Sequence, residues 1–129
     1  MHNFIKLGVM VIAFLGLSFT PTPIAAKKPQ ILNRSCNPVS VGVFSNRIHV
    51  RCKVNARKPY TKNIVYYAMA INSRNSKQVD YTLQAILAAH ANNILLRIWF
   101  DNDDYKSVPG CRLKDCRRLT GVATFRPNG

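Results

Sequence analysis

The hydrophobic pattern is clearest in residues 79–100, where a helical spacing of apolar residues runs directly into an apolar strand. Apolar positions recur at i, i+4, i+7, i+8 and i+11, the spacing of one helical face, and are occupied by Val79, Leu83, Ile86, Leu87 and His90. Asp80 can cap the first turn, and Asn92 and Asn93 tolerate the left-handed backbone that ends a helix. The pattern predicts one helix over residues 79–93 and a strand over 94–100.

Four other segments have the alternation or apolar content of strands: residues 39–44, 47–54, 64–71 and 119–126. The second of these predicts a buried face and an opposite, basic face; we name the latter the basic ladder, made of Arg47, His49, Arg51 and Lys53. The inward face is expected to hold Ile48, Val50, Cys52 and Val54.

Segment 64–71 is apolar on both faces, so it needs a cover from the helix or from a neighbouring subunit. Residues 27–35 lack periodicity and are expected to form an arm outside the core, while 55–63 and 101–118 are expected to be loops. The order strand, strand, strand, helix, strand, strand predicts a β-rich α+β fold. It favours a small five-stranded OB-fold-like barrel with one helix between strands 3 and 4, although other α+β folds share this order.

The chain begins with the features of a secretory signal peptide, over residues 1–26. Lys6 precedes an apolar run that is shorter than a membrane-spanning helix, and the alternative of an uncleaved anchor is therefore less favoured. Cleavage after Ala26 would leave residues 27–129 as a single domain, secreted or periplasmic.

Four cysteines lie after this segment: Cys36, Cys52, Cys111 and Cys116. In an exported small protein they indicate two disulfides, for which three pairings exist. The spacing of Cys111 and Cys116 allows a small closed loop, which would leave Cys36 for Cys52. A four-cysteine zinc site is the alternative, but the pairs lack CxxC spacing, so no metal or other cofactor is expected.

Positive charge dominates the composition, because 19 Lys and Arg residues face five Asp and no Glu, for a net charge of +14. Loss of Lys6 with the signal segment would leave +13. Such a domain is attracted to polyanions such as nucleic acid, acidic glycans or anionic lipid, although a general solubilising surface would have the same composition.

The candidate ligand-binding residues are the basic ladder together with nearby aromatic residues. Binding sites for nucleic acids and sugars combine cationic and aromatic side chains. The candidate set comprises Arg47, His49, Arg51, Lys53, Tyr60 and Trp99, with Tyr66 as a further stacking candidate. Alternatively the ladder is solvated surface and Trp99 covers the helix. His49 and His90 could form a nuclease pair, but a ladder residue and a core-edge residue explain them more simply, so no catalytic residue is assigned. Asp101–Asp104 could bind calcium but is better explained as an exposed turn.

Several segments resemble one known family. IHVRCKV, a helix followed directly by LLRIWF, the Cys-x4-Cys pair CRLKDC and a terminal TGV strand are similar to the OB-fold delivery (B) subunits of pertussis-like toxins, such as those of subtilase cytotoxin and typhoid toxin. The similarity covers about residues 46–125, but here the cysteine pair precedes the last strand and the chain is far more basic. None of that family's glycan-contacting residues is carried over.

The resemblance implies a secreted, non-enzymatic protein that binds host-cell glycans as a homo-oligomer, beside a toxin catalytic subunit. The alternative from composition is a cationic OB-fold protein that binds nucleic acid or envelope polyanions as a monomer.

Overall fold

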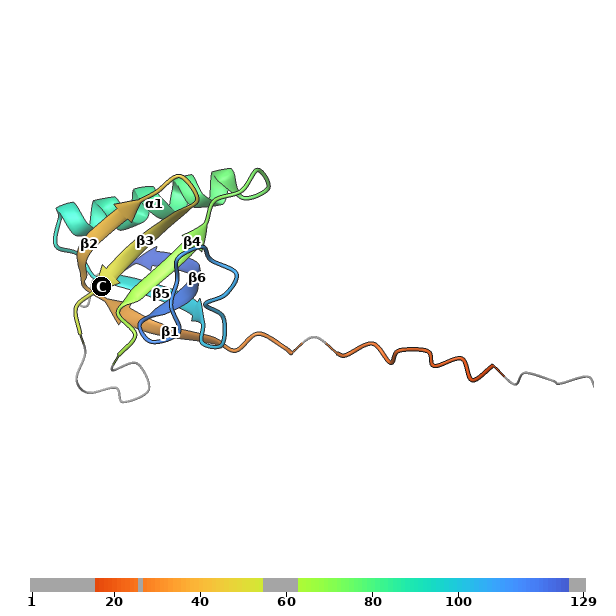
Figure 1. Ribbon diagram of the computed structural model, residues 1–129. Helices are drawn as coiled ribbons and strands as arrows, with labels where there is room; N and C mark the ends of the chain where they lie inside the picture. The colour runs from red at the N-terminus through yellow and green to blue at the C-terminus, as the bar shows by residue number, and fades with distance from the viewer. Residues whose placement is uncertain (1–15, 26, 55–62, 126–129) are drawn as a thin grey trace, which may run out of the picture.

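The computed structural model describes residues 16–25, 27–54 and 63–125 (Figure 1). Within these residues the chain forms one helix and six strands, and the strands lie in a single sheet of order β1-β5-β6-β4-β3-β2. Adjacent strands are antiparallel except β4 and β6, which are parallel. In chain order the elements are β1 (Ile31–Cys36), β2 (Pro38–Val43), β3 (Arg47–Cys52), β4 (Tyr66–Ala70), α1 (Ser76–Ala91), β5 (Leu96–Asp101) and β6 (Cys116–Thr124).

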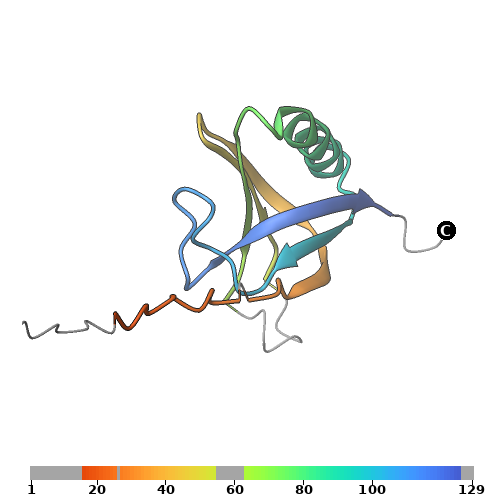
Figure 2. The same cartoon turned by 90° about the vertical axis from the view of Figure 1, so that its right-hand side faces the viewer.

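The two edge strands, β1 and β2, are consecutive in the chain and separated by Asn37 alone. The sheet curls strongly, as Figure 2 shows, yet no ladder of the described residues joins β1 to β2, so the sheet is not closed. The expectation of five strands in a closed barrel was therefore wrong in strand number and in closure. The additional strand is β1, most of which lies in the segment expected to be an arm outside the core.

β1 was missed because its side chains do not alternate between apolar and polar. Its backbone nevertheless pairs with the whole of β5, from Ile31 opposite Asp101 to Cys36 opposite Leu96. Its inward positions are Arg34 and Cys36, and a buried arginine hides the alternation on which a strand is recognised from sequence.

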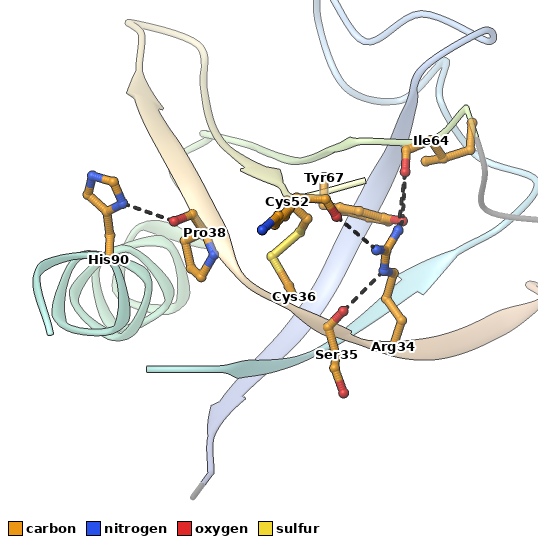
Figure 3. Close-up of a disulfide and its surroundings, with 9 residues drawn as sticks. Arg34, Ser35, Cys36, Pro38, Cys52, Ile64, Tyr67 and His90 are labelled. Atoms are coloured by element: carbon orange, nitrogen blue, oxygen red, sulfur yellow. Dashed lines mark hydrogen bonds between the residues drawn. A yellow bond between two sulfur atoms is a disulfide. The ribbon is translucent and has the colours of Figure 1, made fainter. Parts of the chain in front are cut away.

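Arg34 is 3% exposed and is held by neutral acceptors, as Figure 3 shows. Its guanidinium donates to the Tyr67 hydroxyl at 3.1 Å and to the carbonyl of Ile64 at 3.3 Å. Further bonds reach the carbonyls of Ser35 at 3.2 Å and Lys53 at 3.4 Å. The side chain thus ties β1 to the end of β3 and to the approach of β4.

The core lies inside the curl of the sheet and under α1. The helix packs across β2, β3 and β6, and the apolar members of its buried face belong to the same core. The largest fully buried side chains are Tyr67, Phe100, Ile48, Ile86, Leu96, Ile98 and Leu119.

The helix starts earlier than the sequence predicted and is rotated relative to that prediction. It begins at Ser76 with Asn75 as its N-cap, so Asp80 is not the capping residue. The buried face consists of Val79, Thr82, Ile86 and Ala89, whereas Leu87 is 45% exposed and His90 is exposed. The predicted left-handed stop is confirmed at Asn93, whose φ is 53°.

The second apolar face of β4 packs against a loop of the same chain and not against α1. Ala68 packs there against Val108 and Cys116, with Tyr66, Ala70 and Cys111 around them. The cover therefore comes from the 102–115 loop, defined as the residues between β5 and β6. Part of the apolar face that the sequence left uncovered is therefore covered from within the chain.

Both expected disulfides are present, as Cys36–Cys52 and Cys111–Cys116 (Figure 3 shows the first). The four cysteines are thereby unavailable as zinc ligands. Val54, expected to point inward, is 55% exposed because β3 ends at Cys52.

The signal segment is described only in part. Residues 16–25 have no helix or strand, and residues 1–15 and 26, with the expected cleavage position, lie outside the described residues. In the portion of the chain that is described, no helix has the length and apolar character needed to cross a membrane.

Candidate anion-binding site

The basic ladder lies on the outward face of β3. Ile48, Val50 and Cys52 are buried, and Arg47, His49 and Arg51 alternate with them on the other side of the sheet. Lys53 follows the strand and is exposed. The predicted division of this strand into a core face and a basic face is confirmed for residues 47–52.

Part of the ladder lines a hollow of about 240 Å³ on the outer face of β3 and β4, which we name the β3–β4 hollow. Its floor comes from strands β2, β3 and β4, and one wall comes from the 102–115 loop. The lining residues are Ser40, Arg47, His49, Tyr66, Ala68, Gly110, Cys111, Arg112, Asp115 and Cys116.

Arg47 is held in place on two sides. Its guanidinium lies 4.2 Å from the centroid of the Phe44 ring, a cation–π contact at the β2–β3 turn. On the other side it rests on Gly110, where an added Cβ would lie 2.5 Å from the guanidinium. Because no described carboxylate pairs with Arg47, the structure presents a fixed positive charge in the hollow that is free to meet an anion.

His49 sits between two aromatic rings. Its ring centroid is 5.2 Å from that of Phe44 and 5.3 Å from that of Tyr66, and a side chain at Gly42 would collide with the imidazole. Partial burial of the ring, together with the positive charge of Arg47, lowers the pKa of His49 below its ordinary value. The imidazole is therefore neutral at neutral pH.

Four of the five carboxylates pair with cations other than Arg47 and Arg51. Arg118 contacts Asp101 at 3.3 Å and Asp104 at 2.7 Å. The expectation of an exposed turn was wrong for Asp101, which is the last residue of β5 and is buried. The other two pairs are Lys27–Asp103 at 2.9 Å and Arg112–Asp115 at 3.7 Å. The hollow contains Arg47, Arg112 and Asp115, so an excess of positive charge remains in it.

The remaining predicted ligand residues are not gathered in the hollow. Arg51 is exposed, with its guanidinium 6.0 Å from the Tyr66 ring centroid, and neither it nor Lys53 lines the hollow. Trp99 lies on β5, with β6 and β4 between it and β3, and leans on Gly121 rather than covering the helix. Tyr60 lies outside the described residues.

His90 and His49 are not brought together in this site. His90 is on α1, where its Nδ1 lies 3.2 Å from the carbonyl oxygen of Pro38, and it does not line the hollow (Figure 3). The structure thus gives no support to a nuclease pair among the described residues.

Sequence reasoning missed the 102–115 loop as part of the site. The signal was present in the adjacent Pro109–Gly110 turn and the Cys111–Cys116 pair, which together indicate a short rigid loop. What the sequence could not supply is that this loop folds back over β4 and meets Arg47. Comparison of the chain with models of known protein families and with curated proteins finds no match.

Proposed function

We propose that this protein is a secreted, non-enzymatic binding module of the OB type that takes an anionic group of a glycan in the β3–β4 hollow. The observation that carries the proposal is Arg47, a guanidinium fixed between an aromatic ring and a glycine, with no described carboxylate partner, in a hollow of about 240 Å³.

The strand order supports the OB type when β1 and β2 are counted as two halves of one strand bent at Asn37. The order around the sheet then becomes first, second, third, fifth, fourth, and back to the first. α1 falls between the third and fourth strands. OB barrels are five-stranded and partly open, so the missing ladder between the two halves is compatible with this type.

The position of the hollow supports a binding role. OB-folds bind oligonucleotides and oligosaccharides on the face of strands 2 and 3 and with the loops between strands 1 and 2 and between strands 4 and 5. In the bent-strand count these are β3, β4, the turn that carries Phe44 and the 102–115 loop. The same elements build the β3–β4 hollow and hold Arg47.

The chemistry of the lining favours an acidic sugar over a long polyanion. Guanidinium groups suit a carboxylate or sulfate, Tyr66 offers a ring for the apolar face of a sugar, and Asp115 can accept from hydroxyl groups. A carboxylate in the hollow would repel a continuous chain of phosphates. An acidic glycan is also the ligand class expected from the resemblance to toxin delivery subunits.

A second candidate, binding of nucleic acid or an envelope polyanion, is favoured by one observation. Arg51 and Lys53 continue the positive charge of β3 beyond the hollow, both are exposed, and no described carboxylate pairs with either. A strand of phosphates could follow this line and stack on Tyr66.

The first test compares Arg47→Ala with Lys77→Ala, which removes the same charge from the exposed start of α1. Loss of a charge-assisted contact of 1.5–3 kcal/mol lowers affinity by roughly tenfold or more, so Arg47→Ala should bind acidic glycans on an array at least about tenfold more weakly. Lys77→Ala should match the wild type. Equal binding by both variants would remove Arg47 from the site.

The second candidate is tested with a single-stranded oligonucleotide across a salt series. Replacement of Arg51 and Lys53 by Ala should flatten the dependence of log affinity on log salt by about one unit for each lost phosphate contact. Tighter binding of the oligonucleotide than of any glycan, with this loss of slope, would favour the polyanion function over the glycan function.

A further inference from the structure

His49 lines the β3–β4 hollow beside Arg47, but contacts of an anionic ligand with Arg47 and Arg112 do not by themselves need an imidazole there. Its ring is fixed by Phe44 from the turn, by Tyr66 from β4 and by the bare backbone of Gly42 on β2. The ring therefore has little freedom to turn away from the hollow.

The charged groups around His49 are predominantly positive. Arg47 and Arg51 flank it on β3, and the 102–115 loop contributes Arg112 to the lining of the hollow. The one carboxylate of the lining, Asp115, is paired with Arg112. Without a ligand, protonation of His49 thus adds positive charge to an already positive hollow. With an anion bound in the hollow, the protonated imidazole faces the negative charge of the ligand.

We infer that His49 makes ligand binding in this hollow pH-dependent, so that the acidic ligand is held more tightly as the pH falls below neutral. This inference rests on the proposed function and names the regulation of its site. Because binding of an anion beside the imidazole stabilises imidazolium, one proton is taken up with the ligand over the range in which the free ring is neutral.

The direction of the pH dependence follows from the neutral state of the His49 ring in the ligand-free protein. Burial and Arg47 hold the pKa of His49 down in the empty protein, and a bound anion raises it. Ligand affinity then increases as the pH falls from the His49 pKa of the bound protein to that of the free protein. The total increase is about tenfold for each pH unit that separates these two pKa values. Below both values the affinity is constant.

The test measures the affinity for sulfate, whose charge does not change in the range used, by calorimetry from about pH 8 to about pH 5.5. The wild-type affinity should rise several-fold over this range. His49→Gln should bind with the same weak affinity throughout, and His90→Gln should behave as wild type because His90 lies outside the hollow.

A spectroscopic titration of the wild type keeps the test independent of how well His49→Gln folds. The midpoint of the His49 ring resonance should move to higher pH when sulfate is added, and the midpoint of His90 should not move. Equal movement of both midpoints would indicate a general salt effect and would overturn the inference.

The outcomes separate the inference from the function on which it rests. Sulfate binding that needs Arg47 but has the same affinity at every pH overturns the role of His49 and leaves the binding site standing. If neither sulfate nor an acidic glycan binds at any pH, both the site and its regulation are overturned.

Discussion

Arg34 and Arg47 show that an arginine side chain has different roles when it is buried and when it is half-buried. The buried Arg34 gives its donors to three backbone carbonyls and a hydroxyl, so its charge is solvated by protein dipoles rather than by a carboxylate. Arg47 instead lies half-buried against a ring and a glycine, and it lines the hollow. An arginine whose donors are taken up by nearby hydrogen-bond acceptors, such as Arg34, has a structural role, whereas one with few such acceptors, such as Arg47, can bind a ligand.

Arg34→Met tests the structural role. Methionine fills similar space but leaves the carbonyl of Lys53 without its side-chain donor and removes one of the two donors to the carbonyl of Ile64, the other being the Tyr67 hydroxyl. Bonds to a charged group contribute about 1.5–3 kcal/mol. We expect the free energy of unfolding to fall by about 3 kcal/mol in a urea titration. Arg74→Met, at an exposed turn, is the matched control and should change it little. A urea midpoint of Arg34→Met at or above that of the wild type would contradict this expectation. It would show that the desolvation cost of the buried charge is at least as large as the stabilisation from its hydrogen bonds.

At the scale of elements, the 102–115 loop does two jobs. Val108 and Cys111 pack on the second face of β4, and Gly110, Cys111 and Arg112 line the hollow. The Cys111–Cys116 bond closes residues 111–116, so Arg112 and Asp115 of the hollow lie in a small ring that follows the covering residue Val108. A change in the loop should therefore reach both stability and binding.

Gly110→Ala probes that coupling. Gly110 has a φ of +74°, a left-handed value that costs other residues about 1–3 kcal/mol, and the new methyl group would push Arg47 off its seat. We expect a loss of stability of about that size together with weaker sulfate binding. Gly121→Ala is the control, because its added Cβ would be at an ordinary contact distance of 3.8 Å from Trp99. Normal sulfate binding by Gly110→Ala would contradict the seating of Arg47 on this glycine.

Local pattern predicted β3, the helix and the strand after it, because alternation and helical spacing are written in consecutive residues. It failed where a long-range contact decides the outcome. β1 is a strand because β5 pairs with it, and Arg34 is buried because carbonyls 19 and 30 residues away accept from it. The hollow likewise depends on loop residues, Gly110 to Asp115, that lie more than 60 positions after Arg47.

At the scale of the whole molecule, the two disulfides constrain different amounts of chain. Cys36–Cys52 spans 16 positions and lies in the core, whereas Cys111–Cys116 spans five and lies at the edge of the hollow. Because the loop entropy that a bond removes from the unfolded chain grows with loop length, the first bond should stabilise the fold more than the second.

Paired Cys→Ser replacements measure this difference. Loss of Cys36–Cys52 should lower the free energy of unfolding by about 3 kcal/mol or more, and loss of Cys111–Cys116 by about 2 kcal/mol, by the loop-entropy estimate. Only the second pair should also weaken sulfate binding, since those cysteines line the hollow. The reverse order in thermal unfolding, or equal effects on binding, would assign the two bonds other roles.

The position of Cys36–Cys52 ahead of α1 has a consequence for the order in which the molecule can be assembled. A chain that is threaded through a membrane amino-terminus first would expose both sulfurs to an oxidant while β5, the partner of β1, is still to emerge. The cross-link would then tether β1 beside the completed β2–β3 hairpin. When β5 emerges, its partner strand β1 would already be held beside the β2–β3 hairpin. The pairing of β5 with β1 would then require a shorter conformational search.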